Sequence, residues 1–141
     1  MRKIEEIIIH CSATPEGRHT TVEDIDRWHR DRGFKGIGYH YVIYLDGSIH
    51  KGRDESAVGA HCALRNSKSI GICYIGGCEK VGNKLIAKDT RTPEQKEALM
   101  TLLRDLTARY PDATLHGHNE FSDKACPCFN VQEEYANISI E

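Results

Sequence analysis

The sequence lacks the features of a membrane-spanning or an exported protein. Its apolar runs, such as Ile7-Ile8-Ile9, are far shorter than the roughly 20 residues that cross a bilayer, so we expect no membrane insertion. The first six residues include two glutamates, where a signal peptide has its apolar stretch. We therefore expect a soluble protein made in the cytoplasm, which acts outside the cytoplasm only if something else releases it.

An excess of positive charge is also missing. The 141 residues include 19 Lys and Arg and 21 Asp and Glu, which gives a net charge of −2. A protein that binds nucleic acid through a broad positive field needs the opposite balance, so we expect no nucleic-acid partner. The length fits one folding unit, which we expect to span residues 1–141 as a single domain.

The six cysteines include no Cys-x-x-Cys pair, which argues against a zinc ribbon and against a thioredoxin-like redox motif. Disulfides are not expected either, because no export signal is visible and reducing compartments rarely keep them. Cys62, Cys73 and Cys78 lie in or beside apolar stretches, which favours buried free thiols. The alternative is that one of the cysteines binds a metal or takes part in catalysis.

Strands and helices alternate along the chain. Two helices have N-terminal signals: Thr20-x-x-Glu23 precedes a helix that ends near Gly33, and Thr92-Pro93-Glu94-Gln95 precedes one that ends at Pro111. Asp46-Gly47 indicates a hairpin turn. The expected strands are Ile4 to Ile9, Tyr39 to Leu45, Ser48 to Lys51, Ser69 to Ile75 and Ala113 to Leu115.

The rest of the chain is expected to be less regular. Glu79 to Lys88 is polar and predicts a surface excursion, and the tail from His116 to Phe129 predicts a loop, with a short helix near Val131 to Ala136. These elements predict an α+β (mixed α/β) fold, in which helices flank a central mixed β-sheet.

Side chains that commonly bind metals gather at three places. His10-Cys11 ends the first strand, His116-Gly117-His118 follows the last one, and Cys126 and Cys128 come a few residues later. Two imidazoles, one thiolate and a vacant position form the tetrahedral zinc site of a hydrolase, in which the metal activates water and polarises a carbonyl. Ordinary surface or core histidines are the alternative, so the residue types alone leave the metal site open.

Seven motifs stand in order along the chain: His10-Cys11-Ser12-Ala13-Thr14, Gly38-Tyr39-His40-Tyr41, Asp46-Gly47, Gly52-Arg53-Asp54-Glu55, Val58-Gly59-Ala60-His61, Asn66-Ser67-Lys68-Ser69-Ile70-Gly71-Ile72 and Lys124-Ala125-Cys126-Pro127. Together they resemble a known family, the zinc-dependent N-acetylmuramoyl-L-alanine amidases of type 2. Within it, the sequence is similar to the amidase-type phage lysozymes, which are relatives of the peptidoglycan recognition proteins. The similarity runs from about Ile4 to Phe129.

The resemblance implies three ligands for one Zn²⁺ per chain: His10, His118 and Cys126. By the spacing that the same resemblance implies, His116 falls too early to be the second ligand. Cys128 is a departure, because the family more often has serine there, and it leaves Cys128 as an alternative to Cys126.

The resemblance also assigns further residues to the site. Tyr39 falls on the family's catalytic tyrosine and Lys124 on its catalytic lysine. At neutral pH a phenol is protonated and a lysine is cationic, so both can donate hydrogen bonds to a developing oxyanion. The expected substrate-binding residues are His61, Asn66, Trp28 and Lys68, although core packing is the alternative for Trp28.

The activity implied by the resemblance is hydrolysis of the amide between the lactyl group of N-acetylmuramic acid and L-alanine, with peptidoglycan or a muropeptide as the partner. Two alternatives stay open. In the first, the chain is a module that binds peptidoglycan without cutting it; in the second, it is a cytosolic amidase that recycles soluble muropeptides. The sequence does not choose among phage lysis, wall recycling and a delivered effector, and no protein partner can be identified from it.

Overall fold

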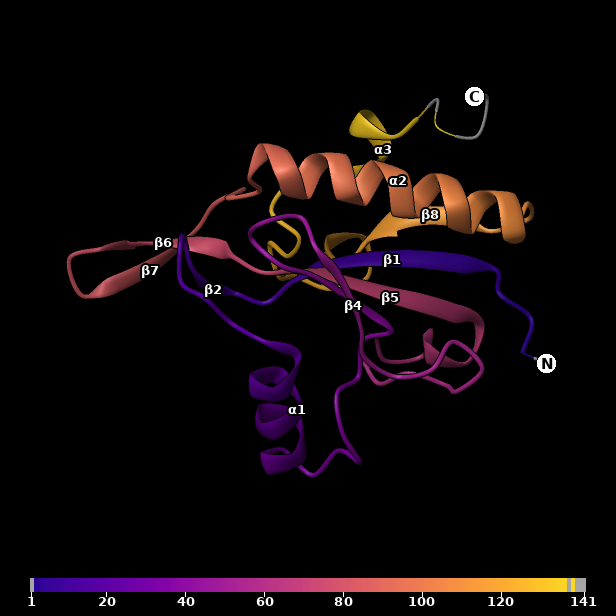
Figure 1. The fold of residues 1–141 in the computed structure, drawn as a ribbon, viewed down its shortest axis with the longest axis horizontal. Helices are drawn as coiled ribbons and strands as arrows, with labels where there is room; N and C mark the ends of the chain where they lie inside the picture. The colour runs from indigo at the N-terminus through magenta and orange to yellow at the C-terminus, as the bar shows by residue number, and fades with distance from the viewer. Residues whose placement is uncertain (1, 137, 139–141) are drawn as a thin grey trace.

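The computed structural model describes residues 2–136 and residue 138, which form two β-sheets and three α-helices (Figure 1). The helices are α1 (Val22–Asp31), α2 (Pro93–Arg109) and α3 (Val131–Glu134). Short 3-10 helices lie at Asn66–Lys68 and His118–Glu120. The strands are β1 (Glu6–Cys11), β2 (Thr14–Pro15), β3 (Tyr41–Ile43), β4 (Ile49–Lys51), β5 (Ser69–Tyr74), β6 (Gly77–Val81), β7 (Lys84–Ala87) and β8 (Thr114–Gly117).

The larger sheet confirms the predicted mixed architecture. Its strand order is β4-β3-β5-β1-β8, in which β3, β5, β1 and β8 run parallel and only β4 is antiparallel. Helices α2 and α3 lie on one side of this sheet and α1 lies on the other (Figure 1). No helix among the described residues is both long and apolar enough to span a bilayer.

The alternation of side chains along β1 separates the core from the opposite face. Ile7 and Ile9 belong to the core beneath α2, which supplies Leu99, Leu103 and other leucines to the same cluster. Successive side chains of a strand point to opposite faces, so His10 faces the side on which α1 lies. The sheet thus places a histidine on the face that α2 does not cover.

Helix α1 begins one residue later than the sequence predicts. The N-cap is Thr21, not Thr20. The Thr21 hydroxyl accepts the backbone amide of Asp24, and the Asp24 carboxylate accepts the backbone amide of Thr21, in a reciprocal capping box. A tertiary contact favours this register, because the hydroxyl of Tyr44 accepts the free amide of Val22 at 2.8 Å. The predicted start of α2 is confirmed, with Thr92 as N-cap.

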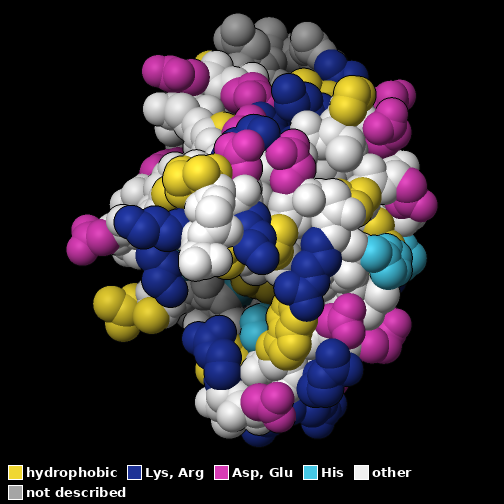
Figure 2. Space-filling model, turned by 90° about the vertical axis from the view of Figure 1, so that its left-hand side faces the viewer, with side chains coloured by type: hydrophobic (Ala, Val, Ile, Leu, Met, Phe, Trp, Pro, Cys, Tyr) yellow, Lys and Arg dark blue, Asp and Glu magenta, His cyan; other side chains and the backbone are white. Residues whose placement is uncertain are grey.

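The segment Glu79 to Lys88 lies at the surface, as predicted, and the structure adds that most of it belongs to a β-hairpin. Strands β6 and β7 pair antiparallel and project from the body of the molecule (Figure 1), and β6 also pairs with β2. The hairpin has no hydrophobic alternation that would reveal it, since Val81, Leu85 and Ile86 are all exposed. Figure 2 looks onto this end, where lysine and arginine side chains are interspersed with hydrophobic ones.

A polar cluster around Glu55 ties the loop after β4 to the end of α2. Arg109 forms two hydrogen bonds with the Glu55 carboxylate at 2.9 Å, and Tyr41 and Tyr110 donate their hydroxyls to it. Partial burial acts to raise the pKa of Glu55, but these hydrogen bonds outweigh it and lower the pKa to about 2. The folded state therefore favours the ionised carboxylate.

We predict that Glu55→Gln lowers the melting temperature at neutral pH by an amount that shrinks in acid. The folded pKa lies below the value of about 4.3 for an unfolded glutamate, so the stabilisation is complete above that pH and is lost as the pH falls toward the folded pKa. Thermal unfolding of both proteins from pH 7 to pH 3 measures the difference. The exposed Glu97→Gln is the control, and a Glu55→Gln deficit that is constant with pH would contradict the prediction.

Candidate metal centre

The first two candidate ligands are brought together by parallel pairing of β1 and β8. Ile9 pairs with Gly117, so the next residues, His10 and His118, lie side by side where both strands end. Their ring centroids are 4.6 Å apart. Carboxyl ends of parallel strands are where open α/β sheets commonly bind ligands.

Cys126 joins this pair from the loop that precedes α3. Its Sγ accepts a hydrogen bond from the backbone N–H of Cys11 at 3.1 Å. One potential ligand atom from each of His10, His118 and Cys126 lies within 4.8 Å of the others. The structure thus gathers the three residues that the resemblance implies as ligands.

The two alternative ligands lie elsewhere. The Cys128 thiol donates to the carbonyl oxygen of Gly77 at 3.2 Å. His116 bonds Thr114 and the Glu120 carboxylate, at 2.7 and 2.8 Å. Neither side chain belongs to the three-residue group found among the described residues.

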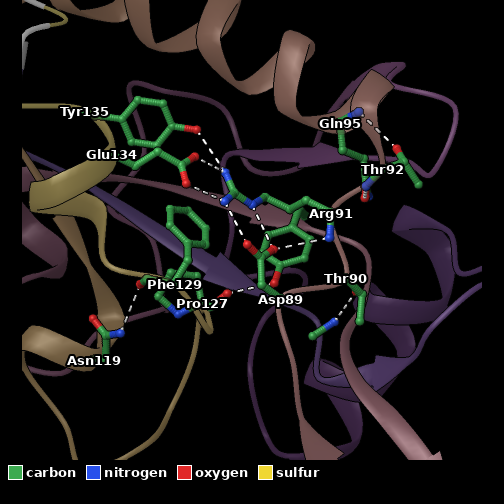
Figure 3. Close-up of polar contacts among 12 residues, drawn as sticks. Asp89, Thr90, Arg91, Thr92, Gln95, Asn119, Pro127, Phe129, Glu134 and Tyr135 are labelled. Atoms are coloured by element: carbon green, nitrogen blue, oxygen red, sulfur yellow. Dashed lines mark hydrogen bonds and ion pairs between the residues drawn. The ribbon is translucent and has the colours of Figure 1, made fainter.

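Polar contacts, several of them made by the buried Arg91, hold the Cys126 loop and helix α3 behind it (Figure 3). Arg91, whose side chain is 1% exposed, forms ion pairs with Asp89 and Glu134 at 2.9 and 2.5 Å. Its guanidinium also lies over the ring of Phe129, 3.5 Å from the centroid. Next to Cys126, the carbonyl oxygen of Pro127 accepts a hydrogen bond from the buried Tyr74 hydroxyl at 2.7 Å. These contacts fix the backbone on the C-terminal side of the thiol.

The electrostatics of the centre suit a metal ion. Burial, followed by the neighbouring imidazoles of His61, His118 and His29, holds the pKa of His10 well below its usual value. Burial and the positive charge of Lys124 lower the pKa of His118. Both imidazoles are therefore neutral at neutral pH, the form that binds metals. The backbone amide of Cys11 donates to the sulfur of Cys126, and such a hydrogen bond is stronger when its acceptor is a thiolate.

His61 contacts the centre directly. Its Nδ1 lies 2.9 Å from Nε2 of His10, and its Nε2 lies 3.1 Å from the Ser69 hydroxyl. The ring stands over Gly71, where a Cβ would lie 2.6 Å from it. His61 is thus placed to orient His10, a relation that the sequence did not reveal. Metal-binding histidines usually have such a hydrogen-bonded partner.

An open cleft of about 600 Å³ leads to the three candidate ligands. Tyr39, Lys124, Trp28, His61 and Asn66 all line it. The ring of Tyr39 lies 5.1 Å from that of His10, and burial, then the nearby thiols of Cys73, Cys126 and Cys11, raise the pKa of this tyrosine well above its usual value. The phenol is therefore protonated, as a hydrogen-bond donor must be.

The predicted substrate-binding residues have different surroundings. Trp28 packs against the cluster around Ile25 and also lines the cleft. The side-chain oxygen of Asn66 accepts the backbone amides of His61 and Cys62, both at 2.9 Å, so it shapes the cleft wall. Lys68 is not brought to the cleft, because it lies on a neighbouring surface where it pairs with Glu5 at 3.3 Å.

Other residues at the site were not singled out from the sequence. Arg32 and Phe34 line the cleft, and Ser69 and Gly71 support His61. Ser69 and Gly71 stand within one of the seven motifs, which was the available signal. Arg91 had none, because its partners Asp89 and Glu134 are recognisable only once α3 has docked.

We predict that Arg91→Met lowers the free energy of unfolding by about 2 kcal/mol. The cost is below the roughly 3–5 kcal/mol of breaking a fully buried ion pair, because Asp89 and Glu134 stay partly exposed and water can solvate them. Urea unfolding measures it. The control Arg27→Met removes an exposed ion pair with Asp24 and should cost less than about 1 kcal/mol. Equal losses of unfolding free energy in the two variants would mean that the Arg91 contacts do not stabilise the docking of α3.

Comparison with known proteins agrees with the geometry of the candidate site. The family profile described as N-acetylmuramoyl-L-alanine amidase matches residues 1–129. The endolysin of Escherichia phage T7 is 41% identical over 128 residues, which cover 91% of this chain and 83% of the endolysin.

Solved structures share the fold. The N-acetylmuramoyl-L-alanine amidase LysC from Clostridium intestinale URNW superposes with a TM-score of 0.81 at 30% identity, over 99% of this chain and 88% of LysC. A variant of Drosophila PGRP-LB in complex with tracheal cytotoxin gives a TM-score of 0.77 at 26% identity, over 96% of this chain and 82% of that protein. With a profile that spans nearly its whole length, the chain belongs to the N-acetylmuramoyl-L-alanine amidase family.

Proposed function

We propose that this peptidoglycan amidase hydrolyses the bond between the lactyl group of N-acetylmuramic acid and L-alanine, with one zinc ion held by His10, His118 and Cys126. The observation that carries the proposal is the grouping of these ligand atoms within 4.8 Å of one another, on residues that line an open cleft. Two imidazoles and a thiolate are a catalytic zinc donor set, and zinc is general in this family. The cleft leaves room for water and substrate on the open side.

Zinc in such a site polarises the scissile carbonyl and makes water nucleophilic at neutral pH. The protein's part is to hold the donors in place. His61 orients the ring of His10, and the Cys11 amide stabilises negative charge on the sulfur of Cys126. These contacts keep the donor atoms together before substrate arrives, which reduces the reorganisation needed during the reaction.

Tyr39 and Lys124 are proposed to stabilise the charge that develops on the substrate. Water adds to the carbonyl carbon of the lactyl amide, and the C–N bond then breaks to give a lactyl carboxylate and the protonated amine of L-alanine, which takes up both protons of the water. While the carbonyl oxygen is negative, the Tyr39 hydroxyl and the Lys124 ammonium can donate hydrogen bonds to it from the cleft wall. The raised pKa of Tyr39 keeps its hydroxyl protonated at neutral pH, as this role requires.

The cleft has the composition expected for a muropeptide. Trp28 and Phe34 offer apolar surface, and Arg32 and Lys124 offer positive charge for the carboxylates of a stem peptide. The structural neighbour crystallised with tracheal cytotoxin supports this choice of ligand. The phage endolysins among the relatives favour action on the cell wall, after release from the cell that makes the protein.

Peptidoglycan binding without hydrolysis is the competing function, since the fold is shared with peptidoglycan recognition proteins. Incubation of the zinc-loaded protein with purified sacculi, followed by detection of new L-alanine amino groups, separates the two. Release of these groups is expected, and binding without release would favour recognition. Comparing intact sacculi with soluble muropeptides then distinguishes a lytic from a recycling amidase.

We predict that Cys126→Ser abolishes hydrolysis and weakens zinc binding, whereas Cys128→Ser does neither. A serine hydroxyl is a poor substitute for a thiolate ligand of zinc, and the Cys128 thiol points to the Gly77 carbonyl instead. Metal content and the release of L-alanine amino groups measure both effects. If the Cys128→Ser protein held no metal, Cys128 rather than Cys126 would be the third ligand.

Removal of the Tyr39 hydroxyl should slow the chemical step without removing the metal. Tyr39→Phe keeps the ring that packs on His10 and His29, so we predict a fall in kcat of about 10²-fold or more, the loss typical of one oxyanion donor. Zinc content should match that of the native protein. Tyr110→Phe, which removes a remote phenol, is the control. An unchanged kcat in Tyr39→Phe would exclude the donor role.

A further inference from the structure

A second groove adjoins the cleft. It has a volume of about 560 Å³ and is formed by residues 63–65 on one side and 119–123 on the other. Ala63 lines both the cleft and this groove, and residues 119–123 directly follow the candidate ligand His118. A substrate bound at the metal centre can therefore extend into the groove without leaving the protein surface.

Leu64, at the rim of this groove, has an unusual conformation. Its φ is +69°, in the left-handed region that favours glycine, and its side chain is fully exposed at 102%. A bulky residue is disfavoured there, and an apolar one gains nothing from exposure to water. Unfavourable backbone conformations of this kind concentrate at ligand-binding sites.

The loop that carries Leu64 is held in place. Asn66 accepts the amides of His61 and Cys62, and the Arg65 amide donates to the carbonyl oxygen of Cys62 at 3.0 Å. The Arg65 side chain pairs with Glu6 at 2.8 Å and lies over the ring of Phe121. Leu64 is thus presented to solvent by a turn that is fixed on both sides.

The charges of the cleft and the groove differ. Among the described residues that line the cleft there is no aspartate or glutamate, and Arg32 and Lys124 are cationic. The groove contains Glu120 and Asp123, while its one cation, among the residues described there, is already paired with Glu6. The cleft therefore suits the anionic stem peptide, whereas the acidic groove repels it, which leaves the uncharged glycan as the part of the substrate that the groove can accept.

We propose that the groove binds the neutral glycan strand next to the muramic acid whose amide is cut, with Leu64 packed against the apolar face of a sugar ring. This inference rests on the proposed amidase function and adds the direction of the substrate. The sugars run from the metal centre over Ala63 toward Leu64, and the stem peptide runs toward Arg32. Ser122 and Asp123, on the opposite wall, offer polar groups to sugar hydroxyls.

The test uses Leu64→Gly in the zinc-loaded, full-length protein. Glycine adopts a positive φ readily, so the fold should be at least as stable as before, and a loss of activity cannot be attributed to unfolding. The substrates are a muramoyl dipeptide with a single sugar and a glycan oligomer that carries the same peptide. We expect kcat/KM for the oligomer to fall about tenfold more than kcat/KM for the single-sugar substrate, the loss of one apolar contact.

Leu85→Ala, which truncates an exposed leucine on β7, is the control and should leave both values unchanged. Equal effects of Leu64→Gly on the two substrates would overturn the proposal. So would an effect that follows the length of the peptide at constant glycan length, because the groove would then hold the peptide. If the native protein cleaves neither substrate, the amidase function itself fails, and that outcome is distinct from a changed ratio.

Discussion

Parallel pairing of β1 with β8 is the constraint on which the site depends. It sets Ile9 opposite Gly117, so that His10 and His118 leave the sheet at the same edge. The residues that face α2 bury this pairing in the main core, which makes the separation of the two imidazoles a property of the fold. Only the third candidate ligand, Cys126, comes from a loop, and a backbone hydrogen bond from Cys11 ties that loop to the same strand.

The loops around this edge divide the proposed substrate surface by charge. Loop 61–66 supplies His61 to the candidate metal centre and Leu64 to the outer groove, with Asn66 holding its backbone. The end of α1 contributes Arg32 to the cleft, whose described lining residues include no acid. A branched substrate matches this arrangement, because its neutral glycan and its anionic peptide would extend from one reacting centre into the groove and into the cleft.

Local patterns predicted the elements whose signals are local. Thr92 and Gln95 bond each other's backbone amides within one turn, so the start of α2 can be read from four residues. At α1 two neighbouring threonines fit the same pattern, and the choice of Thr21 involves Tyr44, a residue far along the chain. The β6–β7 hairpin escaped prediction because both faces of β7 and of the outer part of β6 are exposed, so this part carries no alternation of apolar and polar residues.

For the site, the sequence by itself determined the candidate donors, two imidazoles near the ends of strands and a cysteine in a later loop, and the motifs assigned them to a family. Tertiary structure decided which side chains meet. It joined Cys126 to Cys11 across 115 residues, placed His61 against His10, and turned Lys68 toward Glu5 and away from the cleft. The physical reason is that such contacts depend on strand pairing and loop anchoring, which no short stretch of sequence encodes.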